Sequence, residues 1–112
     1  RVSMHVPDTL RGLRLGTDVE IALYRIAQEA LHNALRHAEP DSVAIRLRRR
    51  AGRLQLTVTD DGGGFDVGSV APGMGLSSMR ERAEAIGAEL DIRSRRGLTR
   101  VCVQVPLPAE TS

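Results

Sequence analysis

A single helical stretch constrains this chain more than any other feature of its sequence. Residues 23–38 carry apolar side chains at the spacing of an amphipathic helix, and Pro40 prevents that helix from continuing. Glu29, Asn33 and His37 recur within it at four-residue spacing. Because a helix turns once in about 3.6 residues, these polar groups line one flank. The chain is therefore expected to fold around a helix that carries polar groups beside its core face.

The sequence also predicts where this helix starts and which side chains it buries. Thr17 or Asp18 is expected to cap its N-terminus, and Glu20 suits the positive end of the helix dipole. The helix is expected to run to Ala38. The stripe that should face the core comprises Leu23, Ala27, Ala30, Leu31, Ala34 and Ala38, with Ile26 at its margin.

Two glycine clusters, 60–65 and 73–76, follow the helix. Glycine has no side chain, so the backbone of these segments can approach a ligand closely. Either cluster alone is typical of an ordinary turn. The order of the helix and both clusters, rather than any one of them, indicates a shared pocket.

The remaining sequence has the periodicities of strands and a second helix. Period-two apolar runs predict half-buried strands, and a spacing of three to four residues predicts a helix. We expect a half-buried strand at 2–6, the long helix, a hairpin over 43–58, a helix at 76–86 ended by Gly87, and a hairpin over 90–105. This order predicts an α/β two-layer sandwich, with helices on one face of a mixed or antiparallel sheet.

Length and composition fit one domain. The 112 residues, 41% of them hydrophobic, suffice for a single core, expected at 1–107 and followed by a flexible tail at 108–112. Cys102 is the only cysteine, so an internal disulfide is excluded. No apolar run approaches the roughly 20 residues of a membrane span and no signal peptide is recognisable, so a cytoplasmic location without direct membrane contact is expected. The start at Arg1, without Met, suggests a piece of a longer protein.

Arginines cluster around the predicted turn of the first hairpin. Basic clusters can bind nucleic acid, but base stacking needs aromatic side chains, and the chain has only Tyr24 and Phe65. Nucleic-acid binding is therefore not expected. The simpler interpretation is a solvated hairpin end kept soluble by Arg46, Arg48, Arg49, Arg50 and Arg53.

Asp60 and the glycines after it suit the base of a nucleoside triphosphate. Adenine carries an exocyclic amine that needs an acceptor. Asp60 ends an apolar strand, where a carboxylate is costly unless a ligand, water or backbone donor satisfies it. Gly62 and Gly64 remove side chains beside it, so a base could lie against the backbone.

Other residues suit the polyphosphate. Gly73 and Gly75, at the start of the second helix, would offer amide donors and a positive helix end. Asn33 offers a neutral oxygen to Mg²⁺, a hard ion that takes few protein ligands. Arg36, about one turn further along, is placed to neutralise phosphate charge.

These segments resemble the motifs of a known family. Residues 22–38 resemble the N box of the sensor histidine kinases paired with NarL-type response regulators. Residues 60–65 resemble the G1 box of that family, and 73–76 with the following 79–82 resemble its G2 box and helix. The resemblance covers nearly the whole chain. It implies a Bergerat ATP-binding fold with ATP and Mg²⁺ as ligands.

The resemblance also implies a role for each matching residue. Asn33 would bind Mg²⁺ and Asp60 would accept the adenine amine. Glu29, which activates water in ATP-hydrolysing relatives, would here at most orient a Mg²⁺-bound water, and with Asn33 it completes the implied catalytic pair. The implied nucleotide contacts are Asn33, Arg36, His37, Asp60, Gly62, Gly64, Gly73, Gly75, Leu76 and Thr99.

The sequence departs from the family pattern at a few positions. His32 stands where Thr or Asn is more usual, and the lid at 66–72 is short. Leu98 precedes Thr99 where the family often has a glycine. A backbone contact at Leu98 is therefore in question, although the Thr99 hydroxyl remains available as a donor.

The family's phosphoacceptor histidine is not recognisable. His5 belongs to a strand, and His32 and His37 belong to the nucleotide helix. The resemblance then implies a catalytic and ATP-binding domain without its dimerisation, phosphoacceptor and sensor domains. It would donate the γ-phosphoryl group to a histidine on a separate dimerisation domain, for transfer to a NarL-type response regulator. We expect this piece to be monomeric and the parent kinase to be a homodimer, whether or not it is membrane-anchored.

Two alternatives remain open from the sequence. The first is an anti-sigma-factor-type serine kinase of the same fold, which the amino-acid sequence of residues 24–38 disfavours. The second is a non-catalytic module that binds nucleotide only to shape a protein surface. Phosphoryl transfer needs no dedicated side-chain nucleophile in this chain, so the sequence separates this second alternative poorly.

Overall fold

The structure, a computed structural model, describes residues 1–10, 12–38, 40–64 and 75–107, with the side chains of Thr9, His37 and Ala38 left undescribed. Its strands form one five-stranded sheet in the order β1-β2-β3-β5-β4. β1 runs parallel to β2, and every other neighbouring pair is antiparallel, so the sheet is mixed. The elements are β1 (Val2–His5), η1 (Asp8–Leu10), α1 (Thr17–Asn33), η2 (Ala34–Ala38), β2 (Val43–Arg50), β3 (Arg53–Asp60), α2 (Leu76–Ala85), β4 (Glu89–Arg95) and β5 (Leu98–Pro106).

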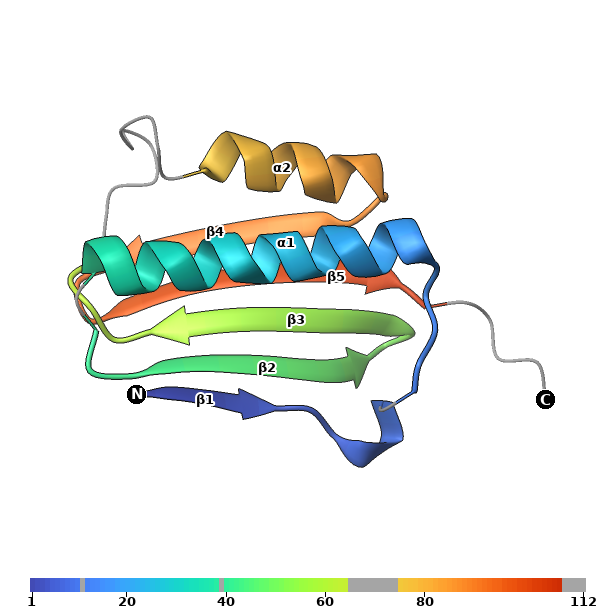
Figure 1. Ribbon diagram of the computed structural model, residues 1–112, viewed down its shortest axis with the longest axis horizontal. Coiled ribbons are helices and arrows are strands. Elements are labelled where there is room, and N and C mark those ends of the chain that lie inside the picture. Colours follow the sequence, from blue (N-terminus) through green and yellow to red (C-terminus); the bar gives the residue numbers. More distant parts are fainter. Residues whose placement is uncertain (11, 39, 65–74, 108–112) are drawn as a thin grey trace.

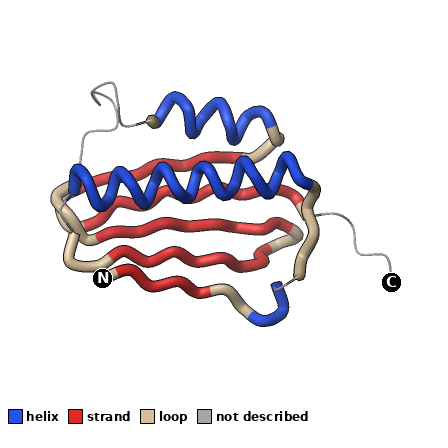
Figure 2. Tube along the Cα trace, in the orientation of Figure 1, coloured by secondary structure: helices blue, strands red, loops and turns tan. Residues whose placement is uncertain are grey.

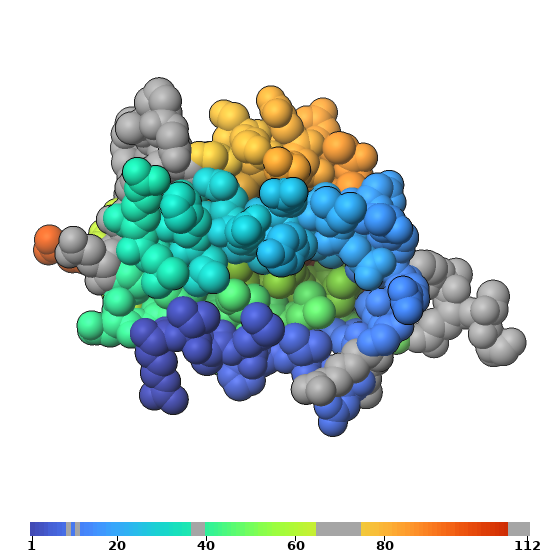
Figure 3. Space-filling model, in the orientation of Figure 1, coloured from blue at the N-terminus to red at the C-terminus, as the bar shows by residue number. Residues whose placement is uncertain are grey.

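Both long helices lie on the same face of the sheet (Figure 1). The strands form the second layer behind them, as the secondary-structure colouring makes plain (Figure 2). Seen from the helix side, α1 and α2 abut over the strands (Figure 3). The predicted α/β two-layer sandwich, with helices on one face of a mixed sheet, is therefore confirmed.

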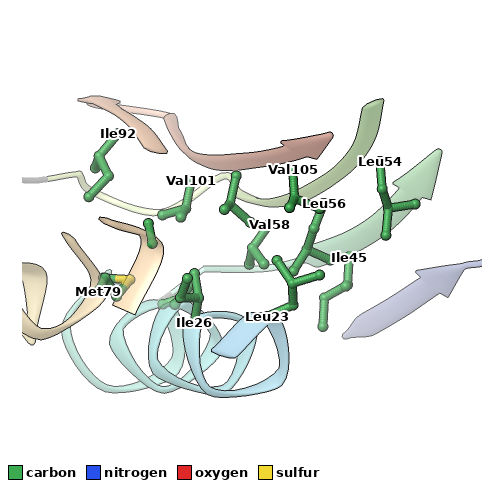
Figure 4. Packing of buried hydrophobic residues seen from close by; sticks show 14 of the residues in the cluster. Leu23, Ile26, Ile45, Leu54, Leu56, Val58, Met79, Ile92, Val101 and Val105 are labelled. Carbon is green, nitrogen blue, oxygen red and sulfur yellow. The ribbon is translucent and has the colours of Figure 1, made fainter. Parts of the chain in front are cut away.

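The core fills the space between helices and sheet (Figure 4). Its deepest side chains are Ile26, Met79, Val43 and Val103, each less than 2% exposed. The prediction that Ile26 lies at the margin of the α1 stripe is wrong. Ile26 is at its centre, whereas Ala27 and Leu31 are only half-buried, because α1 is rotated so that its Ile26 side faces the sheet.

The start of α1 also differs from the sequence prediction. Gly16, rather than Thr17 or Asp18, is the N-cap residue, and no side chain caps the helix there. Gly16 has φ +102°, a conformation that disfavours residues with a Cβ. Its carbonyl accepts a hydrogen bond from the Glu20 amide at 3.0 Å. The helix thus starts at a glycine, without the side-chain acceptor that Thr17 or Asp18 was expected to supply.

The helix runs to Ala38 as expected, but it changes type near its end. After Asn33 the backbone widens into a π-helical turn at Ala34–Ala38. Such turns are rare and occur often at functional sites. Here the turn directly follows the buried Asn33.

Of two further predictions, the one for α2 is confirmed and the one for the burial of the first strand is wrong. α2 buries Met79 and Ala83, and Gly87 ends it with φ +69°, as the sequence predicts. The first strand forms at Val2–His5, but the prediction that it is half-buried is wrong, because Val2 and Met4 are 49% and 66% exposed. β1 is an edge strand that pairs only with β2, so helix α1 does not reach over it. No helix in the described part of the chain is long and apolar enough to cross a membrane.

Candidate functional site

Residues from four elements converge on a cleft where β3 ends beneath the helices. Asn33, Asp60 and Thr99 form its polar side, contributed by α1, β3 and β5 respectively. Leu76 and Met79 from α2 form an apolar wall. Four residues predicted from separate motifs, namely Asn33, Asp60, Leu76 and Thr99, therefore line one cleft.

The cleft is narrow. The cavity between these side chains is about 10 Å³, which is room for about one water molecule. A planar base needs far more space. A ligand larger than water therefore fits only when the side chains that line this cavity, or the elements that carry them, move apart.

Asp60 is the charged group at the bottom of this cleft. It is only 6% exposed and sits directly across from Thr99 on β5 and from Val43 on β2. Burial raises the pKa of its carboxyl above the ordinary value, the Gly62 amide that donates to Oδ1 at 2.9 Å opposes this, and the Asp61 charge adds to it. The fold thus carries an acceptor that is costly to bury and has only part of its hydrogen-bonding capacity used by Gly62.

The loop after Asp60 is braced from both sides. Asp61 accepts hydrogen bonds from the Ser42 amide at 2.9 Å and from the Ser42 hydroxyl at 3.1 Å. The Gly97 amide donates to the Gly62 carbonyl at 2.8 Å. Both braces fix the backbone on which Asp60 is held. Neither Ser42 nor Gly97 was expected from the sequence, because each lies far from the glycine segment along the chain.

The brace at Asp61 predicts a pH-dependent stability. The Ser42 amide is the main reason that the pKa of Asp61 lies below its ordinary value of 3.8. A lowered folded-state pKa gives stability that is present above the unfolded pKa and lost as pH falls through the folded one. Asp61→Ala should therefore unfold at a lower temperature than wild type at pH near 7, with a smaller difference below pH 3.8. Thermal unfolding at both pH values tests this, with the exposed Glu84→Ala as control; an equal deficit at both would contradict it.

Two glycines of the predicted site approach the protein's own backbone or side chains. Gly64 has φ +74°, and a Cβ there would collide with the Arg95 carbonyl. Gly75, the N-cap of α2, has φ +69°, and a Cβ there would collide with the Glu29 carboxylate. Glu29 is half-buried and thus packs against the start of α2. Both positions favour glycine, whatever they contact in a ligand; the neighbour is backbone at Gly64 and the end of a flexible side chain at Gly75.

The remaining predicted residues are placed less directly. Arg36 is exposed on the π-helical turn, and Gly62 is buried beside Asp60. The Thr99 hydroxyl lies 2.7 Å from that of Ser94. The side chain of His37 and the whole of Gly73, Phe65, the lid at 66–72 and the tail at 108–112 lie outside what the structure describes.

The mixed sheet with both helices on one face is the fold that the sequence resemblance implies, the Bergerat fold of ATPase domains. The particular family follows from sequence. The chain belongs to the histidine kinase-, DNA gyrase B- and HSP90-like ATPase family, whose model matches residues 18–109.

Two relatives of the chain are a histidine-protein kinase/phosphatase and a sensor protein. The chain is 39% identical over 92 residues to the signal transduction histidine-protein kinase/phosphatase UhpB of Salmonella typhimurium, covering 82% of this chain and 18% of UhpB. It is 40% identical over 114 residues to the sensor protein VraS of Staphylococcus saprophyticus, covering 100% of this chain and 33% of VraS. The chain thus spans a third or less of the length of these relatives.

Solved structures agree on the fold. The histidine kinase domain of the blue-light activated histidine kinase EL346 from Erythrobacter litoralis matches with a TM-score of 0.79 and 25% identity, over 96% of this chain and 51% of that one. The catalytic domain of histidine kinase ThkA matches with a TM-score of 0.69 at 15% identity, over 94% and 75% of the two chains. At that identity the second match supports the fold alone.

Proposed function

We propose that this chain is the catalytic and ATP-binding domain of a two-component sensor histidine kinase of the NarL-type subfamily. It binds Mg²⁺-ATP and donates the γ-phosphoryl group to a histidine on a separate dimerisation domain, for onward transfer to a response regulator. The observation that carries this proposal is the buried Asp60 facing Asn33 across one cleft. The subfamily assignment is supported by the resemblance of residues 22–38 to the N box of the kinases paired with NarL-type response regulators.

The adenine end of the ligand is assigned to the floor of the cleft. Asp60 accepts the exocyclic amine, while Gly62 and Gly64 keep the neighbouring backbone free of side chains. Leu76 and Met79 offer an apolar wall to the flat face of the base. Thr99, buried beside Asp60, contributes a hydroxyl at the same end.

The phosphate end is assigned to the other side of Asn33. Among the described residues, no group of three or more His, Cys, Asp or Glu side chains is placed to hold a metal ion. An all-protein cage is therefore not available there. Asn33 alone, with Glu29 reaching the ion through water, fits Mg²⁺, which takes most of its ligands from phosphate and water. When bound, the ion would neutralise phosphate charge, together with the Arg36 side chain and the backbone amides of Gly73 and Gly75. His37 would lie near the base instead.

We infer that the acceptor histidine belongs to another domain. His5 and His32 are exposed on β1 and α1, and neither lines the cleft. The role of this chain's residues is therefore to bind and orient the triphosphate so that the incoming imidazole lies in line with the γ-phosphorus. The chain alone should bind ATP without phosphorylating itself.

Transfer from ATP radiolabelled at its γ-phosphate tests this function. With the cognate dimerisation domain added, we expect acid-labile label on a histidine of that domain and none on this chain alone. Acid-stable label on a partner serine would favour the serine-kinase alternative instead. Bound nucleotide without transfer would favour the non-catalytic binding module.

Asn33→Ala tests the metal assignment. Removing the amide oxygen should reduce the Mg²⁺ enhancement of ATP affinity by about tenfold, or about 1.4 kcal/mol, while affinity for adenosine stays the same. Titration calorimetry with and without Mg²⁺ measures both, and the exposed Gln28→Ala on the same helix is the control. An unchanged metal dependence in a folded Asn33→Ala protein would rule out this role.

A further inference from the structure

The face of the sheet opposite α1 and α2, here called the open face, carries a groove of about 620 Å³. Side chains alternate along a strand, so residues that do not enter the core point to this face. The residues that form the groove come from neighbouring strands, chiefly Arg46 and Arg48 of β2, Gln55, Thr57 and Thr59 of β3, and Arg100 of β5.

The strand register gives the groove its shape. Arg46 lies beside Thr57, Arg48 beside Gln55, and Arg100 beside Thr59. The short side chains of β3 therefore form a polar floor between long arginine side chains on either side. His5, paired with Arg46 across β1 and β2, extends the β2 side.

The positive charge of this groove is not neutralised within the described part of the chain. Two salt bridges lie on the open face, from Arg53 to Glu89 at 2.8 Å and from Arg93 to Asp91 at 2.9 Å. Both acids belong to β4, and neither of them lines the groove. Arg48 donates from Nε to Gln55 Oε1. Arg46 and Arg100 make no salt bridge to any residue that the structure describes. Their charges therefore remain available to a partner.

We propose that this groove binds an extended, Asp- and Glu-rich segment of a partner protein. Guanidinium groups on both sides match carboxylates in a fork geometry, which favours arginine at such sites. The hydroxyl group of Thr57 can bond the backbone of an extended chain lying along β3, and that of Thr59, which donates to the Ala44 carbonyl at 3.5 Å, can still accept a hydrogen bond from it. A nucleic acid fits less well, because base stacking needs aromatic side chains, and the one Tyr, Phe or Trp that the structure describes, Tyr24, lies on α1, on the other face of the sheet.

A fluorescein-labelled oligoglutamate peptide tests the groove by fluorescence anisotropy at low salt, about 50 mM. Arg46→Glu combined with Arg100→Glu should weaken binding by about tenfold or more. The matched control combines Arg25→Glu with Arg80→Glu, exposed residues of α1 and α2, and changes the net charge equally. The control should lose no more than about threefold. If the groove variant and the control lost the same peptide affinity, the loss would be due to the change in net charge alone, and the proposal would be overturned.

Further arms separate the groove from folding and from other polyanions. Arg46→Lys with Arg100→Lys keeps the charge but removes the guanidinium fork, so this variant should bind the peptide more weakly than wild type and more tightly than the Arg46→Glu, Arg100→Glu protein. ATP affinity should be unchanged in every groove variant that unfolds at the wild-type temperature. A short oligothymidylate and phosphatidylserine vesicles serve as competing ligands. If either binds more tightly than the peptide and is lost in the Arg46→Glu, Arg100→Glu protein, the assignment to a protein segment is wrong.

Discussion

Asp60→Asn is expected to weaken ATP binding by roughly ten- to a hundredfold, or about 1–3 kcal/mol. The carboxylate presents two acceptor oxygens in a buried cleft, one of which accepts a hydrogen bond from the Gly62 amide. An Asn side chain that keeps this bond turns its NH₂ toward the adenine amine, so that two donors face one another. Titration calorimetry of Mg²⁺-ATP into both proteins measures the difference.

The same substitution is expected to raise the unfolding temperature at neutral pH. Burial raises the pKa of Asp60 in the folded state, so the ionised carboxylate destabilises the fold once pH rises above its ordinary value of 3.8. Asn is neutral, so its advantage should grow from pH 3.8 up to the folded-state pKa and vanish below that window. A variant that loses both ATP binding and stability would make Asp60 a structural residue instead.

Gly64→Ala is expected to cost about 1–3 kcal/mol of unfolding free energy, or roughly 5 °C or more in unfolding temperature. The positive φ accounts for part of this cost. The rest comes from the Arg95 carbonyl, which occupies the place that a Cβ would take and belongs to backbone that cannot move aside easily.

Gly52→Ala provides a matched control for Gly64→Ala. Gly52 has a similar φ of +76°, yet nothing lies within 4 Å of its Cβ position. The control should therefore show only the backbone strain, and thermal unfolding of both variants separates the two contributions. Equal destabilisation of the two variants would mean that the clash between the added Cβ at position 64 and the Arg95 carbonyl contributes nothing to the cost.

Local periodicity was enough to predict most of the fold. The hairpins, both helices and the end of α2 at Gly87 follow from spacing within short windows, and these predictions are confirmed. The pairing of β3 with β5 and the parallel alignment of β1 could not be predicted in this way. They join segments far apart in the chain, and several strand orders bury the same apolar side chains.

The residues of the candidate site could be predicted where a short local motif identified each side chain by itself. Asn33, Asp60, Leu76 and Thr99 were named from separate motifs, and the structure brings them together. The brace between Ser42 and Asp61 could not be named, because a serine before a strand carries no local signal of its distant partner. Leu98 illustrates the converse: its side chain is 39% exposed, on the opposite face of β5 from the buried Thr99, so the bulkier residue does not enter the cleft.

The most direct test compares ATP with inosine triphosphate on the wild-type protein. Inosine carries a carbonyl where adenine carries its amine, and it is otherwise nearly the same size. If Asp60 accepts the adenine amine, its carboxylate would face another acceptor, and inosine triphosphate should bind about tenfold more weakly or worse. Equal affinities for the two nucleotides would contradict the assignment of this cleft to adenine.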